Sequence, residues 1–177
     1  MALDGFEHRD VSLGGLVAQQ FSLQAAARVR SLTLASTASR IGTSEAWRDR
    51  AAVVLNQGMA AVAELALGRF FSDAFRTEAP AVVQGVLDAL CATSPVGYAG
   101  CCAALRDGDL TSEVGAIAAK TLVVAGSRDV STAPDQVRRL AEAIPSAGYV
   151  ELDAAHLCNL EQPRAFTAAV RRLLEGC

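Results

Sequence analysis

The sequence lacks most of the features that mark a specialised class of protein. Its five cysteines form an odd set without a C-x-x-C pair, which argues against a disulfide framework and a structural zinc site, so we expect reduced thiols. Only 20% of the 177 residues are charged, and 16 basic against 19 acidic side chains leave a net charge of −3. This balance indicates no nucleic-acid partner. The 51% share of hydrophobic residues excludes intrinsic disorder.

Long apolar runs are also missing. The stretch from Met59 to Leu67 is shorter than the roughly 18 residues of a membrane span and contains Glu64. The N-terminus carries acidic residues where a signal peptide has basic ones followed by an apolar run. We therefore expect a cytoplasmic protein with no membrane partner.

Three segments have the pattern of β-strands, and two have the pattern of helices between and after them. The strands are predicted at residues 31–36, 121–125 and 149–152, and the helices at residues 134–144 and from Pro163 onward. The second strand is a short continuous apolar run, which suits a parallel strand covered on both faces. The order β-α-β-α predicts an α/β fold with a parallel sheet.

The middle of the chain differs, because residues from about Gly42 to Cys91 show helical apolar stripes and no strand pattern. A helical insertion between two strands of such a sheet is typical of a cap over a site; peripheral packing is the alternative. We expect residues 1–41 and 94–177 to form the sheet core and residues 42–93 the cap.

Near the N-terminus, residues 10–15 read D-V-S-L-G-G and precede a helical stretch. They approximate the nucleophile elbow G-x-S-x-G, in which a serine occupies a strained turn between a strand and a helix. Asp10 departs from this motif, and Ser12 as an ordinary helix start is the alternative. The preceding segment 7–10 is too polar for a central strand, and we expect His8 in a disordered terminus.

Two further polar residues follow the later predicted strands, Asp129 after the second and His156 after the third. With Ser12 they give the chain order Ser, Asp, His, and in a parallel sheet all three would meet at one edge. The histidine would activate the serine, and the carboxylate would orient the histidine. Asp135 and Asp153 are rival acids. This chemistry needs no metal and no other cofactor.

The sequence resembles the 3-oxoadipate enol-lactone hydrolases, which are α/β-hydrolases of protocatechuate (β-ketoadipate) catabolism. The resemblance rests on residues 37–43, Trp47 and residues 69–71, 92–107 and 154–163, and it covers nearly the whole chain from Val11 onward. It implies the C-terminal part of an α/β-hydrolase fold and a hydrolase acting on carboxylic esters, here an enol-lactone. It also implies Ser12 as nucleophile, Asp129 as acid, His156 as base and the backbone N–H of Leu13 as oxyanion donor.

The lactone substrate carries a free carboxylate, which an arginine would complement. We select Arg40, at the exit of the first predicted strand, over Arg48 and Arg50, with a solvated side chain as its alternative. Trp47 would line the same pocket or belong to the core of the cap.

The chain departs from this family at its N-terminus, where members have further strands and a loop that supplies a second oxyanion donor. We expect the later part of such an enzyme, with an unpaired sheet edge that makes the chain either a homodimer or prone to aggregation. An inactive or partner-dependent remnant is therefore the alternative function. A haloalkane dehalogenase or epoxide hydrolase would need an aspartate in place of Ser12.

Overall fold

The computed structural model describes residues 5–145 and 147–175. The chain divides into two compact units, one formed by residues 1–41 and 109–177 and the other by residues 42–108. We call the first the core unit and the second the helical unit. The helical unit ends at Gly108, whereas the predicted boundary lay at residue 93, because the helix after that boundary packs along the first helix of the same unit.

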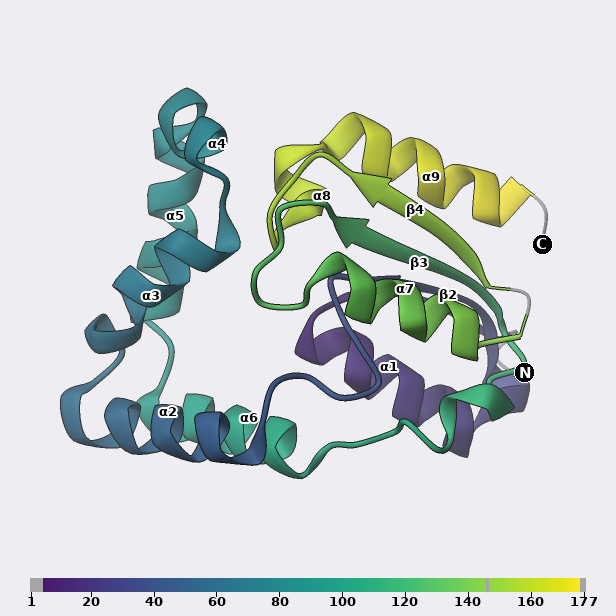
Figure 1. Cartoon of the computed structure of the whole chain (residues 1–177), viewed down its shortest axis with the longest axis horizontal. Coiled ribbons are helices and arrows are strands. Elements are labelled where there is room, and N and C mark those ends of the chain that lie inside the picture. The colour runs from purple at the N-terminus through teal and green to yellow at the C-terminus, as the bar shows by residue number, and fades with distance from the viewer. Residues whose placement is uncertain (1–4, 146, 176–177) are drawn as a thin grey trace. The chain divides into compact units, whose positions relative to one another are not determined.

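The core unit alternates strands and helices (Figure 1). Its elements are β1 (Phe6–Val11), α1 (Leu13–Gln24), the 3-10 turn η1 (Ala26–Arg28), β2 (Val29–Ala35), the 3-10 turn η2 (Val114–Ala116), β3 (Lys120–Gly126), α7 (Pro134–Ala143), β4 (Gly148–Leu152), α8 (Cys158–Glu161) and α9 (Pro163–Glu175). The four strands are parallel and lie in the order β1-β2-β3-β4. The predicted α/β fold with a parallel sheet is confirmed.

Strand position explains strand composition. In β2 and β3 nearly every residue is buried, as expected for central strands covered on both faces. In β4, at one edge, only Leu152 is buried. The central strands therefore carry the apolar runs that the sequence made visible.

The polar segment before Ser12 forms β1, so the expectation of His8 in a disordered terminus was wrong. His8 is half-buried in β1, and its Nδ1 lies 3.5 Å from Asp10 Oδ2. On the other face of the strand, Arg9 Nη2 lies 2.7 Å from Glu7 Oε2. β1 tolerates these side chains because it is an edge strand of the described sheet, where polar groups reach solvent and pair with one another.

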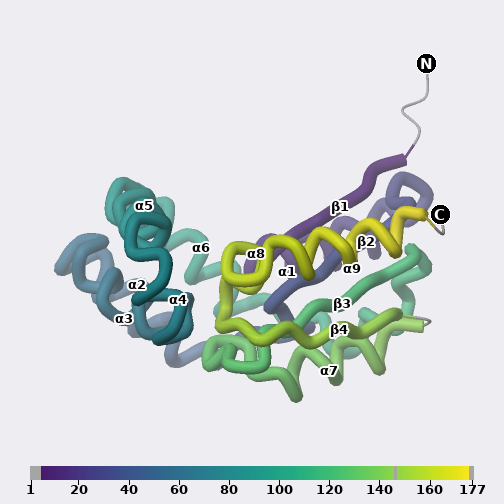
Figure 2. Tube along the Cα trace, turned by 90° about the horizontal axis from the view of Figure 1, so that it is seen from above, coloured from purple at the N-terminus to yellow at the C-terminus, as the bar shows by residue number. Residues whose placement is uncertain are grey.

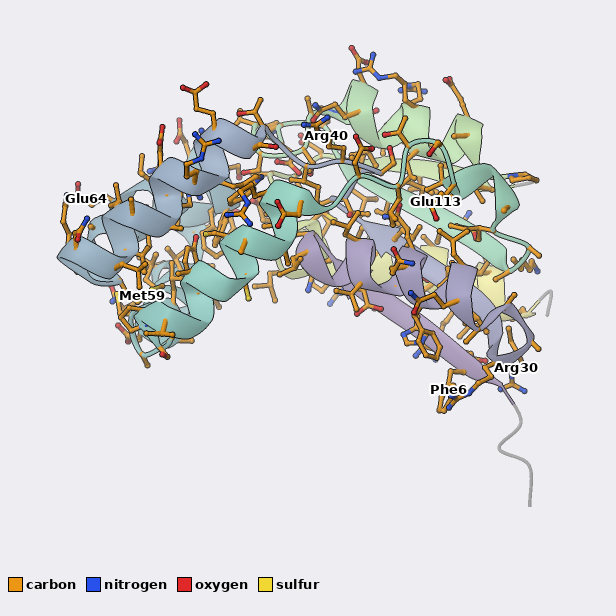
Figure 3. The ribbon with its side chains drawn as sticks, turned by 90° about the horizontal axis from the view of Figure 1, so that it is seen from below. Phe6, Arg30, Arg40, Met59, Glu64 and Glu113 are labelled. Atoms are coloured by element: carbon orange, nitrogen blue, oxygen red, sulfur yellow. The ribbon has the colours of Figure 1, made fainter. Side chains whose placement is uncertain are left out.

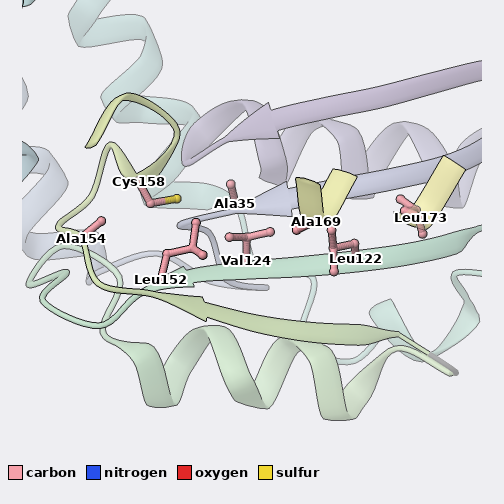
Figure 4. Close-up of a cluster of buried hydrophobic side chains, with 8 residues drawn as sticks. All are labelled: Ala35, Leu122, Val124, Leu152, Ala154, Cys158, Ala169 and Leu173. Atoms are coloured by element: carbon pink, nitrogen blue, oxygen red, sulfur yellow. The ribbon is translucent and has the colours of Figure 1, made fainter. Parts of the chain in front are cut away.

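Helices cover both faces of the sheet. α9 lies on one face, and α1 and α7 lie on the other (Figures 1 and 2). On the α9 side, alternate residues of β3, Leu122 and Val124, pack with Ala169 and Leu173 of α9 (Figure 4). This buried cluster also contains Leu152 at the end of β4. It fixes the carboxyl ends of the strands, from which the candidate site is built.

The helical unit contains α2 (Ser44–Gln57), α3 (Ala60–Phe70), α4 (Asp73–Glu78), α5 (Pro80–Cys91) and α6 (Pro95–Asp107). Thr43, Ser72 and Ser94 cap α2, α4 and α6 by accepting a backbone hydrogen bond in the first turn. Within residues 42–108, all of which are described, there is no strand, as predicted. The cap function of these helices stays a prediction.

Two further sequence expectations concern membranes and thiols. No single helix in the described part of the chain is long and apolar enough to cross a membrane, and α5 with α6, bent by 94°, would reach the required length and composition only as a pair. The expected reduced thiols are present at Cys91, Cys101, Cys102 and Cys158. Of the adjacent pair only Cys102 is buried, while Cys101 is exposed. Cys177 lies outside the described residues.

The chain leaves and re-enters the core unit at neighbouring points. The backbone N–H of Leu110 donates to Ser39 O at 2.8 Å, and the hydroxyls of Ser39 and Thr111 lie 3.1 Å apart. Arg40 Nη1 adds an ion pair with Asp109 Oδ2 at 3.1 Å. The helical unit is thus inserted between two core segments that are bonded to each other.

Candidate active site

Polar residues follow all four strands at the same edge of the sheet. Ser12 follows β1, Ser36 follows β2, Asp129 follows β3 and His156 follows β4. Because the strands are parallel, these positions lie at their carboxyl ends, where α/β folds place their sites.

Backbone hydrogen bonds continue between the strands beyond this edge. The N–H of Ser12 donates to Ala35 O at 3.0 Å, that of Ser36 to Val124 O at 2.8 Å and that of Ser127 to Leu152 O at 2.8 Å. Each loop is therefore anchored to the end of the neighbouring strand. We call these three bonds the edge ladder.

Ser12 has the backbone of an elbow and not that of an ordinary helix cap. Its φ of 56° and ψ of −119° lie in a region that residues other than glycine rarely adopt. An N-cap serine would have an extended backbone and accept a hydrogen bond from the first turn, and Ser12 makes no such side-chain bond. The strain instead places the hydroxyl at a sharp turn between β1 and α1, as in a nucleophile elbow.

Thr37, which the sequence analysis did not single out, supports this turn. Its Oγ1 donates to Ser12 O at 2.8 Å, and its side chain is fully buried. A Cβ on Gly15 would lie 2.7 Å from Thr37 Cγ2, so only glycine fits there. Gly15, the residue after the motif's glycine position at Gly14, therefore lets the first turn of α1 approach the loop after β2 closely.

The second part of the site is a buried acid and base. His156 Nδ1 lies 2.8 Å from Asp129 Oδ2, and the residues are 4% and 3% exposed. The expected hydrogen bond between these two side chains is therefore present. It leaves Nε2 as the nitrogen on the opposite side of the imidazole ring.

Asp129 is held by four hydrogen bonds. Its Oδ1 accepts from the backbone N–H groups of Ser131 and Thr132, at 2.7 and 3.0 Å. Its Oδ2 accepts from Thr132 Oγ1 at 2.7 Å and also faces His156. The sequence analysis missed Thr132, although a threonine three residues after an aspartate, just before a proline-initiated helix, is a signal for such a turn.

The rival acids have other surroundings. Asp153 is exposed and pairs with Arg128, whose Nε lies 2.7 Å from its Oδ1. The hydrogen bond from the Arg128 guanidinium holds the pKa of this carboxyl below its usual value. Asp135 lies in the first turn of α7. The contact between Asp129 and His156 thus favours Asp129 as the acid.

The residues predicted to bind substrate lie in different units. Arg40 is exposed in the core unit, where Asp109 pairs with it. Trp47 is half-buried in the helical unit, beside Gly42 and 5.3 Å from the Arg50 guanidinium carbon. Both roles in substrate binding stay predictions.

Cys158 completes the surroundings of the acid and base. Its thiol lies 3.7 Å from Ser36 Oγ, and burial raises its pKa. A neutral buried thiol is a poor nucleophile. Among the described residues, no group of three or more His, Cys, Asp or Glu side chains could hold a metal ion.

Comparison with known proteins shows that the chain is similar to enzymes of the hydrolase class. No family model matches the chain. It is 34% identical over 165 residues to 3-oxoadipate enol-lactonase 2 of Acinetobacter baylyi, an alignment that covers 93% of this chain and 62% of that protein.

Solved structures agree with that relationship. The enol-lactonase from Burkholderia xenovorans LB400 superposes with a TM-score of 0.95 at 36% identity, over 97% of this chain and 66% of the other. A thermophilic esterase from Thermogutta terrifontis gives a TM-score of 0.91 at 27% identity, over 98% and 65% of the two chains. The chain thus spans about three fifths to two thirds of the length of these relatives.

Proposed function

We propose that this chain is a carboxylic-ester hydrolase that opens 3-oxoadipate enol-lactone. It has the α/β-hydrolase fold and is related to the 3-oxoadipate enol-lactonases. The observation that carries this proposal is the buried 2.8 Å contact between Asp129 and His156 at the edge where Ser12 occupies a strained elbow. The product would be 3-oxoadipate, as in protocatechuate catabolism. A cytoplasmic location belongs to the same proposal.

In the proposed mechanism, Ser12 Oγ attacks the lactone carbonyl while His156 Nε2 accepts the hydroxyl proton. Asp129 stabilises the imidazolium and fixes its orientation through Nδ1. The N–H of Leu13, the first residue of α1, stabilises the oxyanion, since amides in the first turn of a helix have no acceptor within the helix. His156 then returns the proton to the enol oxygen as the C–O bond breaks. In the second half of the reaction His156 takes a proton from the attacking water and gives it to Ser12 Oγ as the acyl-enzyme is hydrolysed, and the released enol tautomerises to the 3-oxo acid.

Arg40 is proposed to bind the free carboxylate of the substrate, with Trp47 lining the pocket. The substrate carboxylate would have to replace Asp109 as the ion-pair partner of Arg40. Arg40→Ala should therefore raise KM for the carboxylated lactone more than for a neutral p-nitrophenyl ester. An equal rise for both substrates would remove Arg40 from the site.

The serine mechanism is tested by labelling and by rate. A fluorophosphonate probe should modify wild-type protein at Ser12, as located by mass spectrometry, and should not modify Ser12→Ala. Hydrolysis of the enol-lactone and of a p-nitrophenyl ester should fall by at least about 10³ in Ser12→Ala and in His156→Ala. Ser22→Ala, a buried serine away from the elbow, is the matched control. Hydrolysis that survives Ser12→Ala would refute the proposed nucleophile.

The alternative function is an α/β-hydrolase chain that is inactive alone or depends on a partner. Labelling at Ser12 without lactone hydrolysis would support this alternative, because the elbow would be reactive while the site lacked a group needed for turnover. Removing one oxyanion donor costs roughly 10² to 10³ in rate.

A further inference from the structure

The loop that carries His156 consists of residues 153–157, between β4 and α8. Ala154, Ala155 and His156 are buried, although none of them belongs to a helix or a strand. Backbone groups that are buried in a loop need hydrogen-bond partners outside regular secondary structure. The partners of this loop decide where the imidazole of His156 lies, and the proposed mechanism leaves their part unexplained.

The end of β3 holds one side of the loop. The backbone N–H of Arg128 donates to Ala154 O at 2.9 Å. Gly126 lies so close to the loop that a Cβ at this position would be 2.6 Å from Ala154 O and closer still to Ala155 O. Only glycine therefore fits at the end of β3, and the loop that leads to His156 rests directly on this strand.

Glu161, at the end of α8, holds the loop from another element. Its Oε1 accepts a hydrogen bond from the backbone N–H of Ala155 at 3.2 Å. The C=O of Ala154 and the N–H of Ala155 belong to one planar peptide group and point in opposite directions. Arg128 binds this peptide at one end and Glu161 binds it at the other. Bonds at both ends hold the peptide against rotation and keep it seated on β3.

We propose that Glu161 is a positioning residue for His156. Its side chain holds the peptide between Ala154 and Ala155 in place, and the loop then keeps Nδ1 of the imidazole in contact with Asp129. The acceptor oxygen of Glu161 matters more than its charge, because the group that it binds is a neutral amide. The inference rests on the proposed function only for the role of His156 as base.

Three substitutions separate the hydrogen bond from the charge. Glu161→Ala removes both, Glu161→Asp keeps the charge on a side chain one methylene shorter, and Glu161→Gln keeps an acceptor oxygen at the same reach without the charge. In p-nitrophenyl ester hydrolysis, kcat should fall about tenfold in the first two and stay within about threefold of wild type in the third, because a displaced base slows proton transfer. KM should change less than about twofold in each.

Glu113 provides the matched control. It is an exposed glutamate immediately before η2 in the same unit (Figure 3), and its replacement by Ala, Asp or Gln should leave kcat unchanged. Gln162→Ala removes a different bond to the same loop, from Gln162 Nε2 to Asp153 O at 3.1 Å. This variant should lower the thermal midpoint while kcat stays within about twofold of wild type, which separates positioning from loop stability.

NMR reports the position of the base without turnover. The proton on His156 Nδ1, bonded to Asp129, should give a downfield signal that exchanges slowly with solvent, because both side chains are buried. The chain has two histidines, so persistence of the signal in His8→Gln assigns it to His156. Its exchange should be at least about tenfold faster in Glu161→Ala and Glu161→Asp, and should stay slow in Glu161→Gln.

The two readouts keep this inference apart from the proposed function. The expected exchange pattern in a wild type that hydrolyses no ester would refute the proposed function and still support the positioning role of Glu161. Unchanged exchange and kcat in Glu161→Ala would overturn the inference. It would also be overturned by a Glu161→Gln variant as impaired as Glu161→Ala, because the charge and not the hydrogen bond would then be responsible.

Discussion

At the residue scale, the site depends on buried groups that hold the acid and the elbow in place. Asp129 receives two bonds from the backbone and one from the Thr132 hydroxyl, in addition to His156. Ser12 has a strained backbone whose carbonyl is bound by Thr37. Neither threonine would touch the reacting atoms, so both act by positioning.

Thr132→Val should lower kcat/KM for ester hydrolysis about tenfold, because it removes a buried hydrogen bond to a carboxylate at nearly constant volume. The free energy of unfolding should fall by about 1–2 kcal/mol, measured by urea denaturation. Thr132→Ser keeps the hydroxyl and should restore most of both. Unchanged kinetics in Thr132→Val would show that the backbone donors alone position Asp129.

Asp153→Asn should reduce stability slightly near neutral pH, since it breaks the exposed pair with Arg128 between the loops of the acid and the base. The lowered pKa of Asp153 means that this contribution is present above the unfolded value of about 4 and is lost as pH falls through the lower folded value. Thermal midpoints of wild type and variant should therefore approach each other as the pH falls from about 4 through that lower folded value. A difference that persists there would assign the effect to something other than the charge.

At the scale of elements, the elbow requires α1 to approach the end of β2 closely. Gly15→Ala would set a Cβ 2.7 Å from Thr37 Cγ2 and 2.9 Å from its Oγ1. The variant should lose about 1–3 kcal/mol of unfolding free energy and most of its labelling at Ser12. Gly68→Ala in α3 has no atom within 4 Å of the added methyl and should be neutral or stabilising by about 0.5–1 kcal/mol.

The elements that could be predicted from the sequence are those with one apolar face packed in the core or with nearly every side chain buried. β2, β3, β4, α7 and α9 were predicted within a few residues because their apolar patterns match their layers. β1 was missed because its stability comes from pairing with β2 and from ion pairs along the strand. The meeting of Asp129 and His156 followed from the parallel topology. The support by Thr37 and Thr132 depends on loop conformation, which no periodicity encodes.

At the scale of the whole molecule, the insertion of the helical unit predicts that the core unit can fold without it. The segments that flank residues 42–108 are held together by the Leu110 to Ser39 bond and the Arg40 to Asp109 pair, both within the core unit. Replacing residues 42–108 with a short Gly-Ser linker should leave a soluble core with cooperative thermal unfolding by circular dichroism. A chain without a cooperative transition would contradict this prediction.

The edge ladder has a consequence for how the site opens. Ser12, Ser36 and Ser127 each donate a backbone N–H to the end of a neighbouring strand, so the loops are joined in series from β1 to β4. Amide hydrogens in such a series exchange with solvent through shared fluctuations, since releasing one loop loosens the anchor of the next. The carboxyl edge of the sheet would therefore exchange as one cooperative unit.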